Sequence, residues 1–280
     1  MESDFSDWIG RHRDRTDLVT RRLMAEFRAT FAPHLAPVPA GVAWPAFHWC
    51  LAPETPAADA LGPDGHAAKG EFLPPVPLPR RMWAGGEVET LSFLREGDAV
   101  TRVETLRDVA FKEGRSGRLC FVTVTHEVIG PRGPAIRERQ DIVYREAAGA
   151  QTGAGTEPER GEATDYESVW QVEATPTLLF RYSAMTFNGH RFHYDQPYAT
   201  KVEGYADLVV HGPVQATLLL NLATTMLGAV PARFRHRGVS PMTANQVFSV
   251  CGRRSDRGWE GVTLDAAGRI CMRASAEGSS

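Results

Sequence analysis

The second half of the chain contains an apolar stretch that reads His211-Gly-Pro-Val-Gln-Ala-Thr-Leu-Leu-Leu-Asn-Leu-Ala-Thr-Thr-Met-Leu227. Its apolar residues lie on nearly all faces of a helix, which predicts a helix over 214–227 that is buried all round. The segments 230–236, 246–252 and 269–276 that follow look like strands. One buried helix followed by an antiparallel sheet predicts a sheet that wraps around a central helix.

The first half is dominated by strand signals. Four segments rich in Val, Thr, Ile, Phe and Tyr are separated by short Gly-containing turns, which predicts an antiparallel meander. They span 87–94, 99–112, 119–129 and 136–145. An amphipathic helix is expected before them, since Val19, Leu23, Phe27 and Phe31 repeat every four residues. The proline- and glycine-rich stretch 53–86 is long for a connection, and such loops are often functional.

A break in composition divides the two halves. Residues 147–164 hold no large apolar side chain and are rich in glycine and small polar residues. Such a segment cannot bury enough apolar surface to order itself, so we expect a linker. The predicted domains are therefore 1–146 and 165–280. The segments 176–185 (helix or strand) and 206–210 (strand-like) lead into the helix of the second domain.

Composition excludes several classes of function. The 280 residues carry a net charge of −3, from 31 basic and 34 acidic residues, so no overall positive field favours nucleic acid or an anionic membrane. No apolar run approaches the ~20 residues of a membrane span, and the acidic N-terminus does not resemble a signal peptide. The four cysteines are scattered, without metal-ligand spacing, which predicts free thiols and a cytoplasmic protein.

A polar motif precedes the buried helix and reads Phe187-Asn-Gly-His-Arg-Phe-His-Tyr-Asp195. An imidazole such as that of His193 titrates near neutral pH and can move protons. The helix that begins at Gly212 presents free backbone N–H groups, which can stabilise a developing oxyanion. Together these parts suit the addition of water next to an acyl carbonyl.

Simpler interpretations of the same residues exist. His193 could be a hydrogen-bonded core histidine, and Asn188 could be a turn residue. His190, His193 and Asp195 could suggest a metal site. However, Asp195 cannot share a helical face with both histidines, and no third ligand is evident, so no metal is expected.

The motif resembles a known family. The run 187–199 followed by His211-Gly212 is similar to the hydratase-2 motif of the MaoC-like enoyl-thioester hydratases, which have a hot-dog fold. In that family an aspartate stands where this chain has Asn188, and an asparagine where it has His190. His193 falls on the family's catalytic histidine. Gly212 falls on the glycine whose amide polarises the thioester carbonyl.

Asparagine at position 188 indicates a particular subgroup of this family. The Thr186-Phe187-Asn188 form, together with 70–86 and 138–145, is similar to a subgroup of mesaconyl-C4-CoA and itaconyl-CoA hydratases and mitochondrial 3-hydroxyacyl-thioester dehydratases. The resemblance covers about residues 35 to 275. It implies an α+β double hot-dog, with two antiparallel sheets that each wrap around a central helix. The first hot-dog, of MaoC N-terminal type, is expected to lack the catalytic pair.

The resemblance implies the reversible hydration of an enoyl-CoA thioester without a cofactor. The expected substrate carries a C5 dicarboxylic acyl group such as mesaconyl or itaconyl. His193 is expected to act as general base, Asn188 to position water, and the Gly212 amide to stabilise the oxyanion. The alternatives are a straight-chain (R)-specific hydratase or dehydratase and a non-catalytic acyl-CoA-binding protein, since an amide at 188 carries no proton.

A further set of residues is expected to contact substrate, with less support. Asp195 could instead orient the imidazole or contact its own loop. The arginines could pair with a free carboxylate or with CoA phosphates, and the sequence does not choose among them. The set consists of His190, Asp195, His211, Arg80, Arg81, Trp83, Arg235 and Arg237. With two hot-dogs in one chain, either a monomer or a homodimer is expected.

Overall fold

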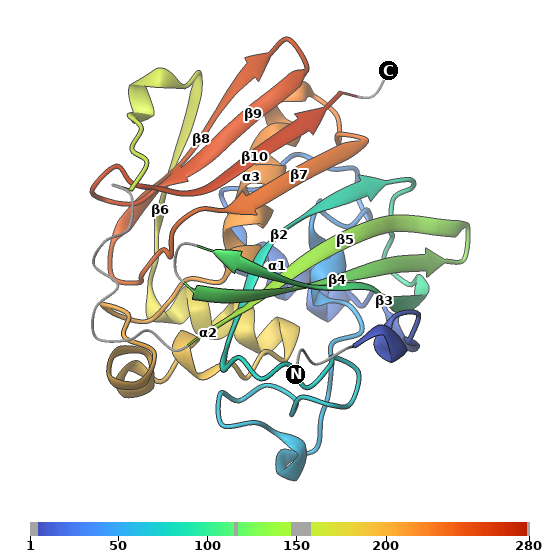
Figure 1. Cartoon of the computed structure of the whole chain (residues 1–280). Helices are drawn as coiled ribbons and strands as arrows, with labels where there is room; N and C mark the ends of the chain where they lie inside the picture. The colour runs from blue at the N-terminus through green and yellow to red at the C-terminus, as the bar shows by residue number, and fades with distance from the viewer. Residues whose placement is uncertain (1–4, 115–116, 147–157, 279–280) are drawn as a thin grey trace.

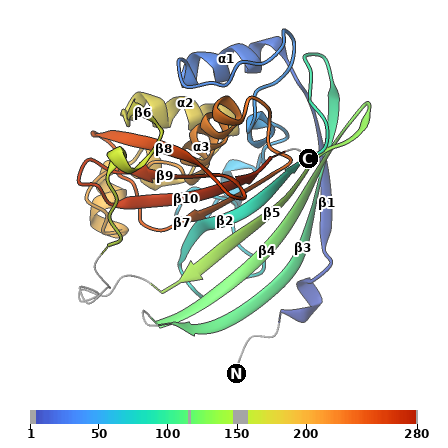
Figure 2. The same ribbon diagram turned by 90° about the horizontal axis from the view of Figure 1, so that it is seen from above.

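The structure, a computed structural model, describes residues 5–114, 117–146 and 158–278. Its strands form one antiparallel sheet in the order β1-β3-β4-β5-β2-β7-β10-β9-β8-β6 (Figure 1). The strands are β1 (His12–Leu18), β2 (Arg80–Thr90), β3 (Ala99–Gly114), β4 (Gly117–Gly130), β5 (Gly133–Arg145), β6 (Ser168–Glu173), β7 (Arg233–Gly238), β8 (Val247–Ser255), β9 (Gly258–Leu264) and β10 (Ile270–Glu277). The α-helices are α1 (Arg21–Phe31), α2 (Pro176–Thr186) and α3 (Gly212–Leu227). Figure 2 shows all three on the same side of the sheet. The short helical turns are η1 (Ser6–Trp8), η2 (Phe47–Cys50), η3 (Ala58–Ala60), η4 (Ala163–Asp165), η5 (Arg191–His193) and the π-helical η6 (Tyr198–Val202).

Helix α3 is the central helix that the sequence predicts. Every residue from Val214 to Thr224 is buried, and α3 packs against strands β7, β8, β9 and β10. The helix ends at Gly228, whose φ of 75° is the left-handed conformation that glycine adopts at helix ends without steric cost. The second half is thus a sheet that wraps around a buried helix.

The two halves share one sheet, where two separate sheets were expected. Strand β2 pairs with β5 on one side and β7 on the other, with Gly85 opposite Arg237 and Gly86 opposite His236. A Cβ atom at Gly85 would come within 2.6 Å of the His236 carbonyl oxygen, and one at Gly86 would overlap the carbonyl of Arg139. Glycine at 85 therefore permits the close approach to β7 that joins the halves, and glycine at 86 permits the approach to β5 within the first half.

The first half differs from the expected second copy of this arrangement. Its longest helix among the described residues is α1, which packs against α2 and η2, and whose Phe27 and Phe31 share one apolar core with residues of the first-half strands such as Val88 and Ile136. The buried face of those strands carries charged and polar groups, including Arg102, Glu104 and His126. The Arg102 guanidinium donates to Nδ1 of His126 over 3.2 Å, and Glu104 lies 3.1 Å from the same ring.

Several local predictions can be compared directly. The amphipathic helix is confirmed as α1, with Phe27 and Phe31 buried, and the segment 176–185 is a helix. The strand-like segment 206–210 forms only an isolated bridge between Val209 and Thr243. The sequence interpretation missed strands β1, β6 and β9. The predicted free thiols are confirmed, since all four cysteines are buried and unpaired.

The predicted linker 147–164 lies mostly outside the described residues, which resume at residue 158. Its described end pairs Arg160 with Arg269 in an isolated bridge and then forms η4. The domain boundaries therefore stay a prediction. No helix in the described part of the chain is long and apolar enough to cross a membrane.

Candidate active site

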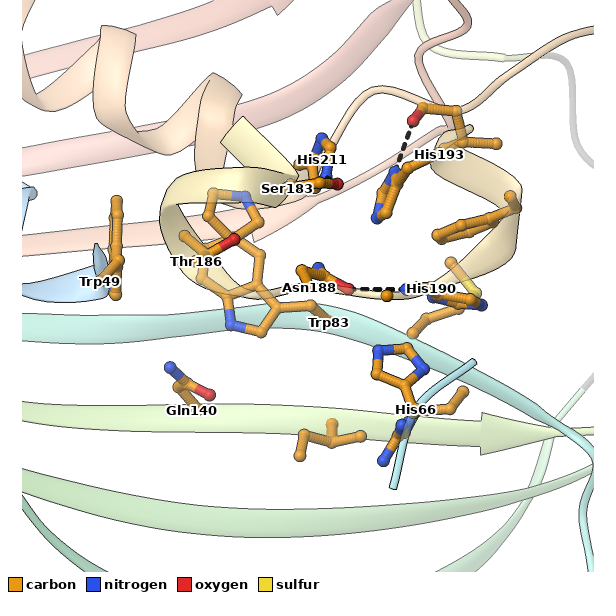
Figure 3. Close-up of a pocket in the computed structure, with 18 of the residues that line it drawn as sticks. Trp49, His66, Trp83, Gln140, Ser183, Thr186, Asn188, His190, His193 and His211 are labelled. Carbon is orange, nitrogen blue, oxygen red and sulfur yellow. Dashed lines mark hydrogen bonds between the residues drawn. The ribbon is translucent and has the colours of Figure 1, made fainter. Parts of the chain in front are cut away.

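A cavity of about 1170 Å³ lies between the two halves of the molecule. Strands β2 and β5 of the first half form one wall, and η5, the end of α2 and the start of α3 form the other (Figure 3). The cavity brings together the three residues expected to be catalytic, Asn188, His193 and Gly212.

His193 lies at the end of η5 with a fixed ring orientation. Its Nδ1 is 2.6 Å from the carbonyl oxygen of Val209. Because a carbonyl can only accept, Nδ1 carries the proton and Nε2 has its lone pair free (Figure 3). Burial lowers the pKa of His193 to about 3, so the ring is neutral at pH 7. A neutral imidazole with a free Nε2 can accept a proton.

His211 supports this ring from the other side. The two imidazoles stack with centroids 3.4 Å apart and planes 12° from parallel. Nε2 of His211 lies 2.9 Å from the Ser183 hydroxyl. Burial, followed by the nearby His193, lowers the pKa of His211 well below its usual value. His211 therefore holds the His193 ring in place as a neutral neighbour.

Gly212 begins helix α3 directly beneath Trp83 of strand β2. A Cβ atom at this position would come within 2.6 Å of the Trp83 ring, so glycine is required for the approach. Trp83 is held in turn by stacking on His236, with centroids 4.3 Å apart. Backbone N–H groups in the first turn of a helix have no partner inside the helix. The Gly212 amide is thus a hydrogen-bond donor at the wall of the cavity.

Asn188 is positioned by the end of α2. Phe187 adopts a left-handed conformation (φ 49°), and the Asn188 N–H donates to the Ser183 carbonyl over 2.9 Å. The Asn188 side-chain oxygen accepts from the backbone N–H of His190 over 2.9 Å (Figure 3). This bond identifies the oxygen of the amide, so its NH₂ group is left to donate into the cavity.

The weaker sequence candidates divide into two groups. His190 lines the cavity, stacked on Phe192 with centroids 3.7 Å apart, and burial lowers its pKa. Asp195 instead binds Arg191 at 2.7 Å and the Tyr198 backbone N–H at 3.1 Å. Its carboxylate therefore holds its own loop and does not contact the His193 imidazole.

The structure separates the four candidate arginines. Arg81 lines the cavity, with its nearest carboxylate, Asp64, at 4.0 Å and its side chain 15% exposed. Arg80 is paired with Glu203 at 2.7 Å. Arg235 and Arg237 are exposed on strand β7 and are not among the described residues that line the cavity.

Sequence reasoning missed two residues of the site, Asp64 and His66, in the long loop before β2. The His66 ring lies 4.1 Å from the ring of His190, measured between centroids, and both line the cavity (Figure 3). The length of the loop and its Asp64-Gly-His66 turn were the available signals. One ligand-type atom from each of these three side chains lies within 4.8 Å of the others.

The burial of so many imidazoles has a consequence for stability. Eight of the nine histidines have a lowered pKa, mainly through burial. The unfolded chain therefore binds more protons below the ordinary histidine pKa of about 6.5, and stability falls as the pH drops through that value. We expect Tm to decrease steadily between pH 7.5 and pH 5. Scanning calorimetry in buffers of equal ionic strength checks this, and a constant Tm would contradict it.

Comparison with known proteins shows the family of the chain. Residues 46–244 match the family described as hydroxyacyl-thioester dehydratase type 2. The chain is 38% identical over 269 residues to the mesaconyl-C(4)-CoA hydratase of Chloroflexus aurantiacus. The aligned region covers 95% of this chain and 94% of the relative.

Solved structures show the fold. A MaoC-like dehydratase has a TM-score of 0.69 at 14% identity, covering 97% of this chain and 99% of that one. A Mycobacterium tuberculosis protein described as having a double hot-dog fold has a TM-score of 0.58 at 12% identity, covering 95% of this chain and 94% of that one. The expected double hot-dog fold is therefore confirmed, with the strands of its two halves joined in one antiparallel sheet.

Proposed function

The chain belongs to the hydroxyacyl-thioester dehydratase type 2 family and is a hydro-lyase, and we propose that it reversibly hydrates an enoyl-CoA thioester at the cavity between its halves. The observation that carries this proposal is the fixed tautomer of His193. Its free Nε2 lines the same cavity as the Asn188 amide and the Gly212 N–H. These are an acceptor for a proton, a donor to water and a donor to an oxyanion.

The proposed mechanism assigns one role to each group. The Gly212 N–H binds the thioester oxygen and stabilises the enolate that forms there. The Asn188 amide holds a water molecule, and Nε2 of His193 takes its proton as the oxygen adds to the β-carbon. The imidazolium can return that proton to the α-carbon, so one water supplies both the hydroxyl group and the hydrogen. Dehydration of a 3-hydroxyacyl thioester runs through the same groups in reverse.

The proposed substrate is a C5 dicarboxylic acyl-CoA such as the C4 thioester of mesaconate or a thioester of itaconate. Two observations support it: the extended similarity to a mesaconyl-C(4)-CoA hydratase and a cationic side chain, Arg81, in the cavity. A carboxylate that leaves water needs such a partner. The straight-chain (R)-3-hydroxyacyl thioesters are the second candidate class. The family description names hydroxyacyl thioesters without specifying the acyl chain, which suits this class as well.

The reaction needs no cofactor in this proposal, because water is the only species added to the substrate and no electrons are exchanged with another molecule. We place the enzyme in the cytoplasm, as a monomer or a homodimer. Its partner is the acyl-CoA itself. If the protein binds acyl-CoA without turning it over, these assignments are wrong.

A hydration assay tests the proposal. Loss of the enoyl-thioester absorbance would be followed with mesaconyl-C4-CoA, itaconyl-CoA and crotonyl-CoA in parallel. We expect turnover of one or both C5 thioesters at a higher kcat/KM than crotonyl-CoA. Preference for crotonyl-CoA would move the protein to the straight-chain class. Binding of all three without turnover would overturn the proposed activity.

The role of Asn188 gives a separate prediction. Its amide donates to water but carries no proton, so Asn188→Asp replaces a donor by an acceptor and adds a charge beside buried imidazoles. We expect reduced but measurable hydration, about 10- to 100-fold below the wild type. The measurement is kcat at pH 7 alongside that of the exposed amide-to-acid control Gln171→Glu, whose side chain contacts the Ser249 hydroxyl outside the cavity lining. Full retention in Asn188→Asp would show that the amide does not position the water.

A further inference from the structure

The loop before β2 is fixed onto segment 188–193, which carries the proposed catalytic side chains. The Arg191 backbone N–H donates to the Asp64 carbonyl oxygen over 2.9 Å. Gly65 has a φ of 86° and lies against Gly189, where a Cβ atom on Gly65 would overlap the carbonyl group. Backbone contact this close requires glycine and holds the loop in register. The loop is therefore part of the wall of the cavity.

This contact presents an imidazole that is oriented by a carboxylate. One Asp64 oxygen accepts from the His66 backbone N–H and the other lies 3.1 Å from Nδ1 of the His66 ring. The carboxylate can only accept when it is ionised, so Nδ1 carries a proton and Nε2 is the free nitrogen. Figure 3 shows the His66 and His193 rings on opposite sides of Asn188 and His190.

The two imidazoles differ in what can stabilise their charged forms. Nδ1 of His193 is bound to a carbonyl group, and its ring stacks on a second buried imidazole, that of His211. Nδ1 of His66 faces a carboxylate, which stabilises an imidazolium far better than a carbonyl does. Asn188 cannot carry a proton. Among the described residues beside Asn188, His66 is therefore the side chain best suited to hold one.

We propose that His66, oriented by Asp64, is a second catalytic residue, the acid that protonates the α-carbon of the enolate. The inference rests on the proposed hydratase function and changes the source of one proton. As the water oxygen bonds to the β-carbon, a water proton passes to Nε2 of His193 and the C=C electron pair moves onto the thioester. The α-carbon then takes the proton from Nε2 of the His66 imidazolium.

The protons balance over a turnover. His193 gives its extra proton to solvent water and His66 takes one from solvent, so each cycle consumes one water molecule. In dehydration, Nε2 of His66 removes the α-hydrogen and the His193 imidazolium protonates the leaving hydroxyl group. The two imidazoles thus have opposite protonation states in each direction of the reaction.

This division of roles predicts a distinctive pH profile. Hydration needs His66 protonated and His193 neutral, so its kcat falls as the pH rises above the pKa of His66. Burial and then the nearby Arg81 guanidinium lower the pKa of His66 below its usual value, and the Asp64 and Glu54 carboxylates offset only part of this, so the decline begins below the ordinary histidine pKa of about 6.5. Its other neighbours, His190 and His193, are neutral at pH 7. A single-base reaction through His193 would show no such decline.

A metal ion is the competing occupant of Asp64, His66 and His190, whose ligand-type atoms lie within 4.8 Å of one another. Two features favour the proton-carrying role. The Asp64 carboxylate already accepts two hydrogen bonds from His66, and the Arg81 guanidinium lies 4.0 Å away, where it would repel a cation.

The experiment compares pH profiles of hydration for the full-length wild type and the variants His66→Gln and Asp64→Asn. The exposed, distant His12→Gln is the matched control. For His66→Gln we expect kcat about 10- to 100-fold lower at the low-pH plateau, KM within about threefold, and no decline at higher pH. For Asp64→Asn the decline should begin at lower pH, because the carboxylate that favours the imidazolium is gone. His12→Gln should match the wild type.

Each outcome has a distinct meaning. A His66→Gln enzyme with wild-type kcat and pH profile overturns the role of His66 while leaving the hydratase assignment intact. Loss of activity on treatment with EDTA, restored by Zn²⁺, also overturns it and assigns these side chains to a metal. A folded wild type without hydration of any enoyl thioester overturns the proposed function, and this inference falls with it. Circular dichroism and Tm confirm that the variants are folded.

Discussion

Replacement of His193 by glutamine is expected to lower the kcat of hydration about 10²- to 10⁴-fold while leaving KM nearly unchanged. The Nε2 atom of His193 is the acceptor for the proton of water, and removal of a general base has costs of this size. Glutamine fills a similar volume and can still donate to the Val209 carbonyl, so the local fold should persist. Steady-state kinetics with the preferred thioester, together with Tm, measures both effects.

The appropriate control is His34→Gln, a half-buried histidine outside the cavity lining. It should retain wild-type kcat. If His193→Gln hydrates at a rate within threefold of the wild type and has the same Tm, His193 is not the base, and the mechanism proposed above is wrong.

The second large effect concerns substrate choice, and it is expected from Arg81→Met. Methionine keeps much of the side-chain volume but removes the cation that would pair with the free carboxylate of the acyl group. Breaking a charge-assisted contact in a partly buried site leaves the partner charge uncompensated. We expect kcat/KM for mesaconyl-C4-CoA or itaconyl-CoA to fall about 10²- to 10³-fold. The value for crotonyl-CoA, which has no carboxylate, should change less than about fivefold.

The ratio of the two specificity constants is the measured quantity, because it cancels any general loss of activity. Arg235→Met is the matched variant, since Arg235 is an exposed arginine paired with Glu87 and Glu277 at 2.5 Å each. It should leave the ratio unchanged. If Arg81→Met lowers kcat/KM equally for all three thioesters, Arg81 supports the site without binding the carboxylate of the substrate.

The sequence predicted the fold well where apolar pattern decides structure. The buried helix α3 was evident because its apolar residues cover every face, and the meander of the first half because turn residues separate its strands. Strand β1 was missed because its residues, His12 to Leu18, are mainly charged and polar, and its pairing partner β3 lies far along the chain. The junction between the strands of the two halves needs glycine at position 85, and that need is evident only when β7 lies beside β2.

The site was predicted in part, for a similar reason. Asn188, His193 and Gly212 stand in one short stretch of sequence, and the family resemblance gave each a role. Asp64 and His66 are more than one hundred residues away, and only the folded chain brings them beside His190. The sequence also could not distinguish Arg81 from the other arginines, because the difference lies in burial and in the partners of each guanidinium group.

The shared sheet has a consequence for behaviour at low concentration. Residues from both halves line the cavity, and the β2–β7 pairing joins these halves within one polypeptide. A site assembled from two separate subunits loses activity on dilution as the subunits part. Here both walls of the cavity belong to one polypeptide, so dilution of the protein does not separate them. Specific activity should therefore stay constant when the enzyme is diluted into the picomolar range.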